Sequence, residues 1–172
     1  MVMAKFTVLT TPINCLNMHV FLDCFIPMFD TNRTDVRQFY LATWRKHLQQ
    51  HPLEGVEALA LPIMLAHPEY HALFALGDAV MDKDYLPESG ITNPFLHMSL
   101  HLALTEQLSI DQPPGVRAYF DRLVLLHQDV HATQHVMLEC LAEMIWQAQR
   151  YVTGYDVQVY FNCLDNKSSG QS

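Results

Sequence analysis

Histidines recur in this chain at a spacing that is typical of metal-binding helices. The 172 residues include ten histidines, and random placement of that many would give roughly 0.6 His-x-x-x-His pairs. Residues four apart on a helix project from the same face, so two such imidazoles can bind one metal ion together. The pairs present are His47/His51, His67/His71, His97/His101, His127/His131 and His131/His135.

The pair His97/His101 falls on a predominantly apolar predicted helix, residues 94–110. Asn93 is a good N-cap residue, and Pro94 is favourable at the first helical position. Because this helix is apolar over most of its circumference, we expect other helices to enclose it on nearly every side. An imidazole carried into such an interior must either find a hydrogen-bond partner or bind a ligand.

A second group of histidines lies on a long helix predicted at residues 129–152. Its polar stripe advances in steps of four residues, on the side opposite the main apolar stripe. A polar stripe usually faces solvent, but it can instead line an internal cavity. We favour the internal position, because Trp146 lies on the same side as the polar residues. The stripe comprises His131, His135, Glu139 and Glu143.

If this stripe is internal, the two helices can bring imidazoles and a carboxylate together across a helical bundle. Such a mixed nitrogen and oxygen donor set suits a transition metal, namely iron, manganese or zinc. The Glu-x-x-His and His-Glu-x-x-His patterns of known metal sites are absent, so the reaction stays undetermined. The first candidate ligands are His97, His101, His135 and Glu139, and the second are His67, His71 and His131.

Each of these histidines also has a purely structural interpretation. His97 and His101 can donate to backbone carbonyls inside the bundle, and His67 can cap the helix that begins at Pro68. The alternative function is therefore a metal-free structural or protein-interaction module with satisfied core histidines. A metal-independent hydrolase would lack a nucleophile, and no glycine-rich phosphate loop is present, so whether the protein is an enzyme stays open.

Composition and charge indicate one compact domain. Half of the residues are apolar and 16% are charged, and a chain of this length can bury a core without disulfides. The net charge of −8 provides no basic surface for nucleic acid or an anionic membrane. The remaining candidate partners are a metal ion and a protein, including a second copy of the chain. The four cysteines lack Cys-x-x-Cys spacing, and a buried, reduced Cys140 predicts a reducing, cytoplasmic location.

The hydrophobic periodicity predicts an all-α fold, an irregular bundle of six or seven helices around the buried helix 94–110. Further helices are expected at 34–50, 53–66, 116–127 and 129–152, with a short helix from residue 68. Residues 157–164 fit a helix, although a strand could also begin there. Residues 77–92 should form a long loop over the bundle.

The chain is expected to contain a single functional domain. The sequence from Met28 onward is more typical of the start of a protein. Residues 1–27 are therefore interpreted as an extension outside this domain, produced by an upstream start. Residues 28–164 form the helical domain, and residues 165–172 form a polar tail.

Four continuous segments of the sequence resemble a known protein family. They are HPEYH at 67–71, TNPFLHMSLH at 92–101, QLSIDQPPG at 107–115 and EMIWQAQR at 143–150. Together they resemble a bacterial family catalogued only as domain of unknown function 1841. The likeness covers about residues 28–164, leaves residues 1–27 outside, and implies a bacterial, soluble helical protein without an assigned activity. Function must therefore be argued from the site.

Overall fold

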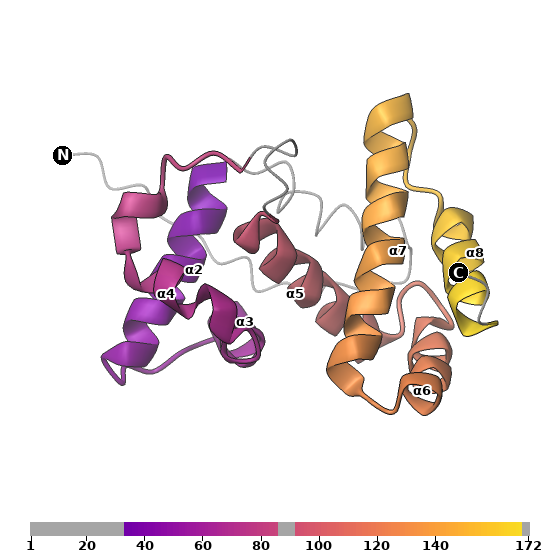
Figure 1. Ribbon diagram of the computed structural model, residues 1–172, viewed down its shortest axis with the longest axis horizontal. Helices are drawn as coiled ribbons and strands as arrows, with labels where there is room; N and C mark the ends of the chain where they lie inside the picture. Colours follow the sequence, from indigo (N-terminus) through magenta and orange to yellow (C-terminus); the bar gives the residue numbers. More distant parts are fainter. Residues whose placement is uncertain (1–32, 86–91, 170–172) are drawn as a thin grey trace, which may run out of the picture.

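The computed structural model describes residues 33–85 and 92–169. Within these residues the fold is all-α, as predicted, with seven α-helices, two short 3-10 helices and no strand. Figure 1 shows α5 lying between one group of helices, α2 to α4, and another, α6 to α8. The elements are α2 (Arg33–Leu48), α3 (Val56–Leu65), η1 (Pro68–Tyr70), α4 (His71–Ala75), η2 (Gly77–Val80), α5 (Pro94–Ile110), α6 (Val116–His127), α7 (Val130–Tyr151) and α8 (Val157–Ser168).

Helix α5 connects two hydrophobic cores. Its N-terminal part contributes Phe95 and Met98 to a core formed with α2, α3 and α4. Its middle part contributes Leu100 and Leu104 to a second core formed with α6, α7 and α8. Side chains on the first two turns of α5 therefore lie where the two cores meet.

The burial of α5 is extensive but not complete. Most of its residues are buried, whereas Leu96 and Ile110 are 46% and 45% exposed. The prediction of a buried central helix that other helices enclose on nearly every side is therefore not confirmed. The two faces that are buried are those turned toward the two cores.

Capping by Asn93 fixes the start of α5. Its Oδ1 accepts from the backbone N–H of Phe95 at 3.1 Å and of Leu96 at 3.3 Å, which satisfies two donors that lack partners within the helix. We expect Asn93→Ala to lower the free energy of unfolding by about 1 kcal/mol, measured by urea denaturation. Asn93→Asp retains the acceptor and should restore most of the loss. Equal losses in both variants would contradict the capping role.

The cysteine prediction was wrong. Cys140 in α7 and Cys163 in α8 form a disulfide. The chain turns back after α7, so that α8 packs alongside it (Figure 1), and the two Cα atoms lie 5.5 Å apart, within bonding range. The disulfide removes the basis on which a reducing compartment was inferred. Among the described helices, none combines the length and the apolar character that crossing a membrane requires.

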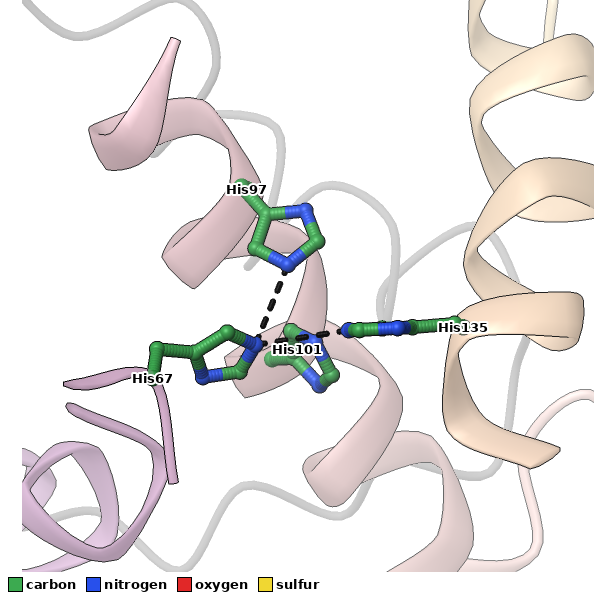
Figure 2. A group of neighbouring side chains, drawn as sticks. All are labelled: His67, His97, His101 and His135. Carbon is green, nitrogen blue, oxygen red and sulfur yellow. Dashed lines mark hydrogen bonds between the residues drawn. The ribbon is translucent and has the colours of Figure 1, made fainter. Parts of the chain in front are cut away.

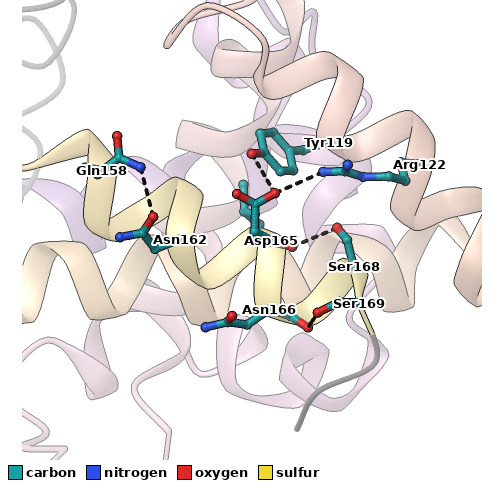
Figure 3. A network of polar contacts seen from close by, with 9 residues as sticks. Tyr119, Arg122, Gln158, Asn162, Asp165, Asn166, Ser168 and Ser169 are labelled. Atoms are coloured by element: carbon teal, nitrogen blue, oxygen red, sulfur yellow. Dashed lines mark hydrogen bonds and ion pairs between the residues drawn. The ribbon is translucent and has the colours of Figure 1, made fainter.

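The segment that begins at Val157 forms a helix, α8, and not the alternative strand. This helix continues past Leu164 to Ser168. Figure 3 shows the polar contacts that hold it against α6. The Tyr119 hydroxyl donates to Asp165 at 2.9 Å, and Arg122 lies 3.5 Å from the same carboxylate oxygen. The first residues of the predicted polar tail are therefore helical.

Two further predictions fall partly or wholly outside the described residues. The extension at residues 1–27 is outside them, and so are residues 86–91 of the predicted loop. The described start of that loop forms η2. At the end of η2 and just after it, the backbone carbonyls of Val80, Met81 and Lys83 accept hydrogen bonds from the buried Arg37 guanidinium.

Candidate metal centre

Four imidazoles from three separate segments meet where α3, α5 and α7 approach one another. Each residue offers one nitrogen that can bind a metal, and these four nitrogens all lie within 4.8 Å of one another. Figure 2 shows His67 facing His97 and His135 across the gap between the helices, with His101 alongside. We call this group the four-histidine cluster: His67, His97, His101 and His135.

Local sequence explains the position of each ring. His97 and His101 lie one turn apart on α5, so both project from one face. His135 lies in the second turn of α7, whose start is capped by Asp129, the acceptor for the Ala132 N–H at 2.8 Å. His67 follows the end of α3 and precedes Pro68, the first residue of η1. It is an N-cap by position only, since its side chain makes no capping hydrogen bond.

The tautomer of His67 follows from its hydrogen bond to the main chain. Its Nδ1 lies 2.8 Å from the carbonyl oxygen of Ile63, and because a carbonyl only accepts, Nδ1 carries the hydrogen. In the neutral ring, Nε2 then holds a lone pair. That lone pair faces the cluster, where Nε2 of His97 and Nε2 of His135 lie at 3.1 and 3.3 Å. An imidazole oriented by a backbone carbonyl in this way is usual for metal ligands.

His101 brings a deeply buried ring nitrogen without a hydrogen-bond partner to the cluster. Its side chain is 2% exposed, and its Nε2 is buried with no hydrogen-bond partner among the described residues. A buried polar atom left unpaired costs free energy, so such atoms are rare in stable proteins. A metal ion bound by the cluster would remove this cost.

The spacing of the nitrogens fits a first-row transition metal. Zinc–imidazole bonds of about 2.0–2.1 Å in a tetrahedral site place neighbouring nitrogens about 3.3–3.4 Å apart. The Nε2 atom of His67 lies 3.1 Å from that of His97 and 3.3 Å from that of His135. Both distances from His67 are therefore close to those of a bound site, and all four nitrogens lie within 4.8 Å of one another.

Burial keeps the imidazoles neutral. Desolvation, followed by the proximity of the other histidines, lowers the pKa of His97 to about 4 and the pKa of His101 to about 2. Desolvation also lowers the pKa of His67 and of His135. Neutral imidazole is the form that binds a metal, so at neutral pH no proton has to be displaced from these rings.

His131 lies beside the cluster without belonging to the group of four. Its ring centroid is 4.3 Å from that of His135 and 4.8 Å from that of His67. It is also stacked on His101, with the centroids 5.7 Å apart. His131 therefore borders the site rather than completing it.

Two other candidate ligands have different partners. The Nε2–H of His71 donates to the carbonyl of Met64 at 2.9 Å, and the ring packs against Trp44. Glu139 is exposed, and its Oε2 forms a salt bridge with Nζ of Lys167 at 2.8 Å. The polar stripe of α7 is thus divided: His131 and His135 face the site, whereas Glu139 and Glu143 are exposed.

Two pockets lie against the cluster. The first, of about 310 Å³, lies between α3, α5 and α7, and we call it the α3-side pocket. The second, of about 320 Å³, lies between α5 and α7 and includes His97, His135 and Glu139. The α3-side pocket also includes Thr105 and Gln134, which belong to no spaced pattern and so could not be predicted from the sequence. All four histidines of the cluster therefore line one or the other of these pockets.

The comparisons with known proteins agree with the resemblance seen in the sequence. Residues 32–166 match the family described as "Domain of unknown function (DUF1841)". The chain belongs to this family. No curated protein and no solved structure matches it. Three cluster histidines, His67, His97 and His101, lie within sequence words that carried the resemblance. Because the family has no assigned activity, the function is inferred from the geometry of the site.

Proposed function

We propose that this protein binds one transition-metal ion through His67, His97, His101 and His135. The observation that carries the proposal is the orientation of His67. Its Nδ1–H is held by the Ile63 carbonyl, so that its Nε2 lone pair faces the Nε2 atoms of two further histidines. The unpartnered, buried Nε2 of His101 supports the same conclusion.

The donor set favours some metals over others. Imidazole nitrogen suits zinc, iron, copper and nickel, whereas manganese prefers oxygen ligands. Among the described residues, the cluster contains no carboxylate, and Glu139 is engaged by Lys167. Zinc and iron are therefore better candidates than manganese. Such an ion would supply Lewis-acid chemistry, or electron transfer in the case of iron.

Elemental analysis of protein purified without a His-tag tests this proposal. We expect close to one equivalent of a transition metal, and after chelation we expect zinc or iron to restore thermal stability. A metal concentration roughly 100-fold above Kd stabilises by about 2.7 kcal/mol, which corresponds to about 5–10 °C in Tm for a domain of this size. Less than a tenth of an equivalent, with no thermal shift, would end the metal assignment.

A metal-free structural cluster is the second candidate, and one observation favours it. The Nε2 lone pair of His67 can accept a hydrogen bond from His97 or from His135 without any ion. One lone pair cannot fully satisfy two donors, however, and His101 Nε2 stays unpaired. In this second case the Tm would be the same with chelator and with metal.

A further inference from the structure

The α3-side pocket has one apolar wall and one polar wall. Helix α3 and the residue after it form the apolar wall, and Leu59 within it is 50% exposed. Helices α5 and α7 form the polar wall, together with the imidazole of His67. The apolar wall is Ala58, Leu59, Pro62, Ile63 and Ala66, and the polar wall is His67, His101, Thr105, His131 and Gln134.

The charge of the metal-bound cluster is not balanced by its ligands. Four neutral imidazoles leave the full charge of a divalent ion, and among the described residues no aspartate, glutamate or cysteine belongs to the cluster. Two carboxylates act on it from a distance: Glu69 is exposed, and Glu139 is paired with Lys167. Neither lines the α3-side pocket. A partly buried positive charge favours an anionic ligand.

The polar wall offers groups that can hold such an anion. The His131 ring is 4.8 Å from the His67 ring, between centroids, yet lies outside the group of four. Its imidazole N–H and the amide of Gln134 are hydrogen-bond donors, and both residues line the pocket. His101, whose Nε2 is proposed to bind the metal, belongs to the same wall and places the charge of the ion there. Donors and positive charge therefore lie on one side, opposite the hydrocarbon surface of α3.

We infer that the α3-side pocket binds a small carboxylate with a short hydrocarbon chain. The carboxylate lies beside the cluster and the polar wall, and the chain lies along α3. A pocket of about 310 Å³ is at the small end of ligand sites, which excludes a polymer. The second pocket is less suitable for an anion, because Glu139 lines it. This inference rests on the proposed metal binding.

Titration of the cobalt(II)-loaded full chain with hexanoate tests the inference. The visible absorption of cobalt(II) reports on the groups near the metal. We expect hexanoate to change the spectrum at saturation and to bind more tightly than acetate, by about three- to fourfold for each methylene buried. Hexanol, which has the chain without the charge, should bind far more weakly. Equal affinities for hexanoate and acetate would overturn the apolar part of the site.

Variants on exposed positions locate the binding. Leu59→Asp places a negative charge on the pocket wall and should weaken hexanoate binding about tenfold or more, whereas Leu59→Asn should cause a smaller loss. The control is Leu125→Asp on α6, where the leucine is 74% exposed and lines neither pocket. Equal affinity in Leu59→Asp and Leu125→Asp would overturn the location.

The two proposals fail in different ways. A chain that binds no cobalt, zinc or iron overturns both the metal site and the carboxylate pocket. A chain that binds cobalt, requires the cluster histidines, and shows no spectral response to hexanoate overturns the carboxylate pocket alone.

Discussion

Replacing His67 by alanine should lower the affinity for zinc by at least about 100-fold, because changes to groups that merely orient a ligand already cost roughly 10- to 100-fold. His67 is the ring whose Nε2 lies close to two others, so its loss removes a ligand and the alignment of its neighbours. Competition with a chromophoric chelator measures the affinity. Folding is checked by far-UV circular dichroism.

The control variants use histidines with the same sequence spacing. His51→Ala removes an exposed imidazole of another His-x-x-x-His pair and should leave zinc affinity unchanged. His71→Ala removes the partner of the Met64 carbonyl and the ring against Trp44. It should therefore lower stability with little change in affinity. Comparable losses of affinity in His67→Ala and His51→Ala would refute a specific site.

Acid should destabilise the metal-free chain before its carboxyl groups titrate. The pKa of His97 falls to about 4 and that of His101 to about 2 in the folded state, because of burial and neighbouring histidines. The unfolded chain takes up protons near pH 6.5, whereas the folded chain does not. Stability is therefore complete above about pH 7 and declines as the pH falls through about 6.5 toward the folded pKa values.

The expected loss between about pH 7 and about pH 4.5 is about 3–5 kcal/mol from these two groups. This corresponds to a Tm lower by at least about 6 °C, measured by calorimetry in the presence of chelator. The double variant His97→Gln, His101→Gln lacks both groups and should show a much shallower slope over this interval. A wild-type Tm that is constant over the interval would show that these rings protonate as readily in the folded chain as in the unfolded chain.

An ion bound at the cluster would link the two hydrophobic cores. Phe95 and Met98 belong to one core, and Leu100 and Leu104 belong to the other. The cluster lies at their junction and joins segments from both, with His67 following α3 and His135 on α7. Binding of an ion there would hold the two halves together, because a ligand that binds only the folded chain adds its binding free energy to stability.

The sequence by itself predicted the local elements and named three of the four cluster histidines, His97, His101 and His135, as first candidates. Asn93, Pro94 and an unbroken apolar pattern define α5 at residues 94–110, and the structure has the same bounds. The four-residue spacing placed His97 and His101 on one face, since a helix turns about 100° per residue. His135 was also expected to join them, and the structure places it in the cluster.

The tertiary structure alone decided which further groups meet there. The pair His67/His71 is not on one continuous helix, because Pro68 starts η1 between them, so only His67 reaches the cluster. Glu139 lies one step beyond His135, rotated by about 40°, and its carboxylate pairs with Lys167 of α8 and is not part of the cluster. The Cys140–Cys163 disulfide likewise depends on the packing of two separate helices, α7 and α8. Spacing along a chain fixes the face of one helix, whereas the neighbour of that face depends on how separate helices pack.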